Sequence, residues 1–195
     1  MSQSEQKSIP SLNRSLLTGA LGFGLVSLCV FASVAFGERW MYMHLGLTGA
    51  YLTWTVLFIL LGGGVLGSLV IGQWRLPKFY FLFGLAFFVY AFGWCAAYFA
   101  FGDGVGEWIG SIVGSVLMAL VFAIGFRAVK SIVTLSVILF IANSAGYFLG
   151  SALNNSLGGK PGMLSWGAAY GLFLGAGLGA VLHLGQNDRR SDRAV

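Results

Sequence analysis

Six long apolar runs alternate with short polar segments along the chain, and the polar segments hold all of its charged residues. A helix needs about twenty residues to cross the roughly 30 Å hydrocarbon core of a bilayer, and each run has about that length. The pattern therefore predicts an all-α membrane protein, a bundle of six transmembrane helices. The predicted spans are residues 15–37, 47–72, 79–102, 108–126, 131–153 and 163–185, with a disordered cytoplasmic tail at 1–14 and a second cytoplasmic tail at 186–195.

Basic residues are unevenly distributed between the polar segments. Nine of the eleven lysines and arginines fall in the two tails and in turns near residues 75 and 127, which leaves Arg39 and Lys160 on the opposite side. Because lysine and arginine concentrate on the cytoplasmic side, both termini are predicted to be cytoplasmic, in a bacterial inner membrane. A cleaved signal peptide is the competing interpretation of the first run, since Lys7 and Arg14 precede it and Ser33-Val34-Ala35 resembles a cleavage site.

Glycines spaced four residues apart mark several predicted spans. Between Trp166 and His183 they form an unbroken series at Gly167, Gly171, Gly175 and Gly179. This spacing places them on one stripe of a helix, where another backbone can approach closely. We predict that the stripe is the packing spine of the bundle. Further glycines predicted to pack helices are Gly64, Gly110, Gly114, Gly146 and Gly150.

A threefold repeat of helical hairpins is a further hypothesis. Basic residues Arg14, Lys78 and Lys130 open the three hairpins, and the run CVFASVAFG from Cys29 resembles CAAYFAFG from Cys95. The third hairpin lacks this motif, and apolar sequence of low complexity produces such similarities by chance.

Composition narrows the class of function. Only 9% of the residues are charged, against about a quarter in a soluble domain. Uncharged spans argue against proton-coupled pumping and against catalysis by carboxylates within the membrane, so no enzyme activity is predicted. The spacing of Cys29 and Cys95 fits neither a metal site nor a redox pair, and His44 and His183 are predicted on opposite membrane sides. We therefore predict no metal, no haem or other cofactor, and no nucleic-acid partner.

Candidate ligand-binding residues come from polarity and depth. Asn143 is an amide near the middle of the fifth span, where the alternative role is a hydrogen bond between helices. Aromatic residues that end in polar groups can line a pocket for a planar or cyclic ligand, or they can form an interfacial belt. Six of them are predicted in the outer half of the membrane: Tyr51, Trp54, Trp94, Tyr98, Tyr147 and Tyr170.

Two functions are compatible with these features. The first is a carrier or channel for a small neutral or amphipathic solute. In size and six-span plan, the chain resembles the substrate-binding membrane subunits of energy-coupling-factor vitamin transporters, a resemblance that assigns no individual residue. The alternative is a non-catalytic subunit or assembly factor of a larger complex, whose glycine ladders dock partner helices or further copies of the chain within the lipid bilayer.

Overall fold

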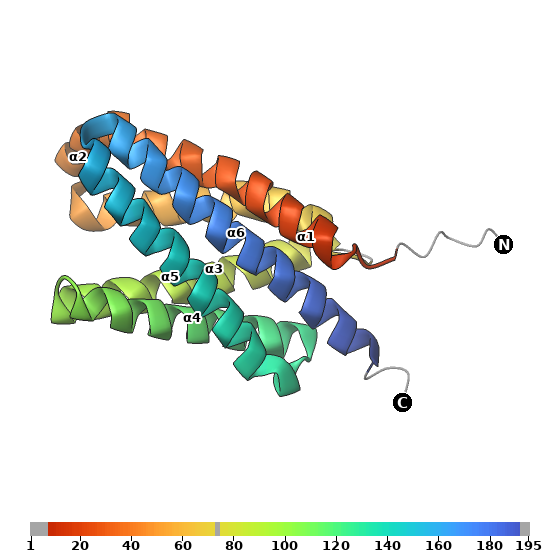
Figure 1. Cartoon of the computed structure of the whole chain (residues 1–195). Helices are drawn as coiled ribbons and strands as arrows, with labels where there is room; N and C mark the ends of the chain where they lie inside the picture. Colours follow the sequence, from red (N-terminus) through yellow and green to blue (C-terminus); the bar gives the residue numbers. More distant parts are fainter. Residues whose placement is uncertain (1–7, 73–74, 192–195) are drawn as a thin grey trace.

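The computed structural model describes residues 8–72 and 75–191, all of whose regular structure is helical. The tail residues 1–7 and 192–195, and Gln73 and Trp74 of the first basic turn, lie outside the described residues. The elements in order are α1 (Leu12–Thr18), the π-helix η1 (Gly19–Phe23), α2 (Gly24–Leu66), η2 (Gly67–Leu69), α3 (Arg75–Phe101), α4 (Val105–Phe126), η3 (Val129–Ser131), α5 (Ile132–Leu157) and α6 (Gly159–Ser191). They form one bundle of antiparallel helices (Figure 1).

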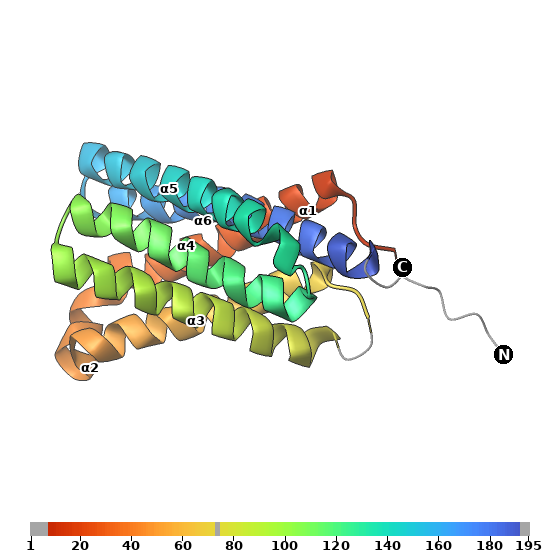
Figure 2. The same ribbon diagram turned by 90° about the horizontal axis from the view of Figure 1, so that it is seen from below.

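Within residues 8–72 and 75–191, five helical stretches are long and apolar enough to cross a membrane, as expected for an integral membrane protein. The first of them, Leu12–Leu69, contains a reversal at Gly46, whose φ of 65° and ψ of −179° are not helical. Glycine adopts this conformation without the steric cost of a side chain. The two arms that Gly46 separates pack against each other (Figures 1 and 2), and the ring of Phe23, in η1 of the first arm, stacks on Phe58 of the second with centroids 5.7 Å apart.

Helical structure extends beyond several predicted boundaries. The segment from Glu38 to His44 is helical, although a loop was predicted there, and the reversal takes place at Gly46 alone. The predicted loop between residues 154 and 162 is reduced to a turn at Gly158, with a φ of 65°. Residues 186–191 continue α6, where a tail was predicted. Short connections of this kind keep consecutive helices antiparallel neighbours.

Helix α6 occupies the centre of the bundle. It packs against α5, α2, η1, α1 and α4. In its most apolar stretch 67% of the residues are buried, compared with 33% in the corresponding stretches of α3 and of α5. Figure 1 shows it running between the α1–α2 layer and α5. The helix with the longest glycine series is therefore also the most enclosed one.

The glycine stripe of α6 faces the first helical arm at very short range. A side chain on Gly175 would overlap the carbonyl group of Gly19, and one on Gly179 would overlap the carbonyl of Ser15. Gly171 lies beside the Cα atom of Gly24. We call this contact the α6 seam; it brings two backbones together across η1, which a side chain at any of these glycines would prevent.

The other predicted packing glycines also face helices of the same chain. Gly114 and Gly110 of α4 lie against Tyr90 and Trp94 of α3. Gly150 of α5 leaves room for the indole ring of Trp166 on α6. Gly146 of α5 lies against Tyr170 of α6, and Gly64 of α2 lies near the hydroxyl of Tyr80 of α3.

Polar residues near the end of α6 hold the neighbouring helices together. Gln186 is buried, its Nε2 donates to the carbonyl groups of Leu69 and Leu182, and its Oε1 accepts from the backbone N–H of Ile71 at 3.0 Å. Asp188 accepts a hydrogen bond from Ser131 at the start of α5. We call residues 183–188 the α6 clasp.

His183 completes the α6 clasp by a contact with the N-terminal segment. Its Nδ1 lies 2.9 Å from the carbonyl oxygen of Pro10, which can only accept, so the proton is on Nδ1. Its Nε2 then accepts from Nδ2 of Asn187 at 3.0 Å. The α6 clasp thereby contacts the segments that precede α1, follow η2 and begin α5.

Candidate ligand-binding cavity

A cavity of about 200 Å³ lies in the half of the bundle opposite the α6 clasp. Both arms of α2, together with α3, α5 and α6, contribute to its wall, and no lining residue is charged. Ten of the lining side chains are aromatic: Phe31, Tyr51, Trp54, Phe58, Phe87, Tyr90, Trp94, Tyr147, Trp166 and Tyr170. A wall of this composition suits an apolar or planar ligand, whose position a few polar groups determine.

The structure brings five of the six predicted aromatic residues to this cavity. Tyr51, Trp54, Trp94, Tyr147 and Tyr170 all line it, although they belong to four different helices. Helix packing produces this convergence, because glycines on α4 and α5 let the large rings of α3 and α6 point inward. The ring of Trp94, for example, lies 5.2 Å from that of Tyr147 between centroids.

Tyr98 lies outside the cavity wall. Its ring stacks on Trp94, with centroids 5.3 Å apart and an interplanar angle of 13°, and its hydroxyl donates to Asp103 at 2.7 Å. A second carboxylate acts similarly at the same end of the bundle, because Glu107 accepts a hydrogen bond of 2.8 Å from Tyr147. These two acids orient aromatic rings from outside the cavity.

Asn143 lies behind the cavity wall and is completely buried. Its Oδ1 accepts from the hydroxyl of Tyr90 at 2.5 Å, and its Nδ2 donates to Ser111 at the same distance. Since the proton of Tyr90 is used in this way, the hydroxyl of Tyr170, 2.8 Å away, donates to Tyr90. Ser144 extends the network through Ser111 at 2.8 Å. Asn143 thus fixes two ring hydroxyls that face the cavity, and it links α3, α4 and α5.

Three tryptophans of the wall have unused hydrogen-bonding capacity. The Nε1 atoms of Trp54, Trp94 and Trp166 are buried and have no acceptor among the described residues. An indole N–H can only donate, and leaving such a group unpaired costs about 1–3 kcal/mol. Most hydroxyl protons of the wall are in use, including that of Thr55, which donates to the carbonyl of Tyr51 at 2.9 Å. The unmet hydrogen-bonding demand in this wall is therefore for acceptors.

Sequence reasoning missed half of the aromatic wall. Tyr90 and Trp166 were not among the candidates, nor were Phe31, Phe58 and Phe87. Tyr90 could have been found from its distance of four residues from Trp94, because residues four apart share one face of a helix. The three phenylalanines have no polar atom to separate them from the many lipid-facing phenylalanines of this chain.

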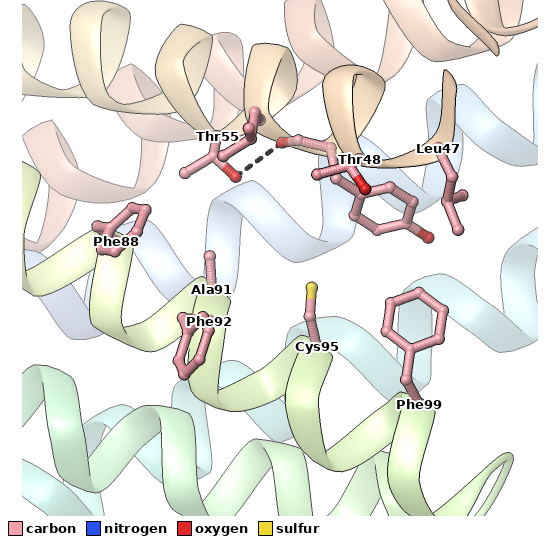
Figure 3. A pocket seen from close by; sticks show the side chains of 10 residues that line it. Leu47, Thr48, Thr55, Phe88, Ala91, Phe92, Cys95 and Phe99 are labelled. Atoms are coloured by element: carbon pink, nitrogen blue, oxygen red, sulfur yellow. Dashed lines mark hydrogen bonds between the residues drawn. The ribbon is translucent and has the colours of Figure 1, made fainter. Parts of the chain in front are cut away.

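A second hollow of about 220 Å³ lies on the outer surface between α2 and α3 (Figure 3). Leu47, Leu52, Phe92 and Phe99 line it and expose roughly half or more of their surface. In Figure 3 the thiol of Cys95 projects from α3 toward Thr48 and Thr55 of α2. We call this hollow the α2–α3 groove.

Metal ligands do not gather anywhere in residues 8–72 and 75–191, which contain no group of three or more His, Cys, Asp or Glu side chains able to hold an ion. The chemistry available at the cavity is therefore stacking, apolar contact and hydrogen-bond donation. Comparison with known proteins adds no assignment, because no family model, no curated protein and no solved structure matches this chain.

Proposed function

We propose that the protein is a multi-pass carrier for a small, neutral, amphipathic solute that binds in the aromatic cavity. The observation that carries the proposal is the cavity wall itself: ten aromatic side chains from helices distant in sequence line a hollow of about 200 Å³ without a single charged group. A lipid-facing belt would spread such residues over the outer surface instead.

The proposed topology is six membrane crossings with both termini in the cytoplasm of a bacterial cell. The reversal at Gly46 supports it, because a straight helix of the 58 residues in the first stretch would be about 87 Å long. The distribution of charge supports it as well. Arg14, Lys78, Arg127 and Lys130 belong to the end with the α6 clasp, whereas Glu38, Asp103 and Glu107 belong to the opposite end.

The unpaired indole groups support a solute that carries a hydrogen-bond acceptor. A ketone, ester or ether oxygen could accept from Trp54 or Trp94 as their rings adjust around it, which would recover part of the cost of leaving them unpaired. A charged solute has no counter-ion in the wall, and its desolvation would oppose binding. The alternative function, a docking subunit, loses support because the packing glycines other than the exposed Gly64 are covered by helices of the same chain.

The test uses three bicyclic probes that share one ring system: tetralin, 1-tetralone and protonated 2-aminotetralin. Binding to the full-length protein in lipid nanodiscs is measured by calorimetry, and movement across the bilayer by uptake into proteoliposomes. We expect the ketone to bind about tenfold more tightly than the hydrocarbon, and the ammonium compound to bind most weakly. Absence of ketone binding, or preference for the cation, would overturn the proposal.

A further inference from the structure

The α2–α3 groove is continuous with the cavity. Four residues, Tyr51, Thr55, Ala91 and Cys95, line both. The two hollows therefore meet along the contact between α2 and α3.

The contact between α2 and α3 is held at one end. The hydroxyl of Tyr80 donates to the carbonyl of Leu60 at 2.9 Å, beyond the groove on the side of the α6 clasp. Along the groove itself the hydroxyl of Thr55 is directed to its own helix, since it donates to the carbonyl of Tyr51. The two helices are thus joined near Tyr80 and meet through apolar and aromatic side chains near Cys95.

The groove has the surface chemistry of the bilayer core. Its exposed lining is leucine and phenylalanine apart from Thr48, it holds no charged residue, and Phe92 exposes 67% of its surface. A lipid-dissolved molecule can therefore enter it without losing hydration. The end of the bundle nearest the cavity carries the carboxylates of Asp103 and Glu107 instead.

We propose that the solute reaches the cavity sideways from the lipid phase, between α2 and α3 past Cys95. This inference rests on the proposed function and adds that the solute is a membrane-partitioning compound with a ring system small enough for the cavity. Tyr51, Ala91 and Cys95 line the route, because they belong to the walls of both hollows, and Cys95 is a native reporter on it.

The test follows alkylation of Cys95 in full-length Cys29→Ala protein in liposomes, with N-ethyl-, N-butyl- and N-hexylmaleimide at equal aqueous concentration. Each added methylene raises the concentration of reagent in the bilayer about fourfold. Because Cys95 already lines the α2–α3 groove, a groove open to the lipid phase predicts a rate that rises about tenfold or more from ethyl to butyl and again from butyl to hexyl, while the association rate of 1-tetralone measures passage beyond Cys95 into the cavity. Rates that stay equal or fall along the series would overturn it.

Two tryptophan substitutions separate route from site. Thr48→Trp fills the groove without changing the cavity wall, and Val133→Trp adds the same ring to a lipid-exposed position of α5 that is 70% exposed. We expect Thr48→Trp to slow both alkylation and 1-tetralone association at least tenfold, and Val133→Trp to change neither by more than twofold. Phe99→Ala, which widens the groove, should accelerate both.

Equilibrium binding distinguishes the two proposals. A block on the route changes rates in both directions, so the dissociation constant of 1-tetralone for Thr48→Trp should stay within twofold of the wild-type value. If the wild-type protein bound tetralone and Thr48→Trp left its association rate unchanged, the lateral route would be wrong while the carrier function stood. If the wild-type protein bound none of the three bicyclic probes, the function itself would be wrong.

Discussion

At one end of the bundle aromatic rings leave a cavity of about 200 Å³, whereas at the other end the α6 clasp fills the space between helices with hydrogen bonds. The cavity wall contains three buried indole N–H groups without acceptors, while Gln186 in the clasp satisfies both its amide oxygen and its amide nitrogen. The network of Tyr90, Asn143 and Tyr170 lies between the two regions. Unpaired groups and empty space are features of a binding site, and fully paired groups are features of a fixed joint.

The comparison also concerns motion. A carrier must expose its cavity to one side at a time, and in this structure the α6 clasp and the α6 seam close the side that we assign to the cytoplasm. The following substitutions test the closed half first and the open half last, in order of decreasing effect.

The largest effect is expected from Gly175→Leu. The added side chain overlaps the carbonyl of Gly19, so α6 and the first helical arm must separate, at a cost of about 3 kcal/mol or more. Size-exclusion chromatography and thermal unfolding should show loss of the folded monodisperse protein. Gly37→Leu is the matched control, because nothing lies within 4 Å of a side chain at that position, and it should behave as wild type.

Asn143→Leu should have the next largest effect. It removes the partner of Tyr90 and of Ser111 in a completely buried network, which we expect to lower the free energy of unfolding by about 1–2 kcal/mol. Steric trapping in bicelles measures this quantity. Because the two residues share a hydrogen bond, Tyr90→Phe combined with Asn143→Leu should cost less than the sum of the single changes. Additive costs would contradict the network.

Gln186→Ala should weaken the α6 clasp by about 1 kcal/mol. The backbone N–H of Ile71 donates to Gln186, so its hydrogen exchange should accelerate, with little change at the cavity. Ser156→Ala, at an exposed position where the hydroxyl bonds only to its own helix, provides the comparison. Unchanged hydrogen exchange at Ile71 would show that Gln186 does not stabilise this end of the bundle.

The smallest effect on stability is expected from Trp54→Phe. The substitution keeps an aromatic ring but removes an unpaired donor, so the free energy of unfolding should change by no more than about 1 kcal/mol. Affinity for 1-tetralone should fall severalfold toward that of tetralin. Trp108→Phe, at an exposed position of α4, should leave the affinities for 1-tetralone and for tetralin as in wild type.

Sequence reasoning succeeded where a pattern has one physical cause. Apolar runs of membrane-crossing length correspond to long helices, because every backbone polar group must find a partner within the bilayer. The position of the reversal at Gly46 was harder to predict, since the polar residues from Glu38 to His44 have the composition of a loop although they continue the helix.

The candidate site was predictable only in part, for a related reason. Depth along each helix indicated Tyr51, Trp94 and Tyr147, but the facing direction of each helix depends on its packing partners. Contacts of glycines with large side chains, such as Gly150 with Trp166, determine which way each helix faces. These contacts form between different helices, so they exist only once the bundle has assembled. The partners of Asn143 were hidden in the same way, since Ser111 and Tyr90 have no local pattern that points to it.

The π-helix η1 gives the first arm of the bundle one more residue than a regular helix would need there. Gly19 and Gly24 are five residues apart, yet both face α6, because an i→i+5 turn absorbs the additional residue. The bulge thus acts as a tolerated insertion: removing Leu21, which points outward and is 65% exposed, should restore a regular helix with both glycines still aligned on α6. A chain of this length can therefore vary by one residue in its first helix and keep the same architecture.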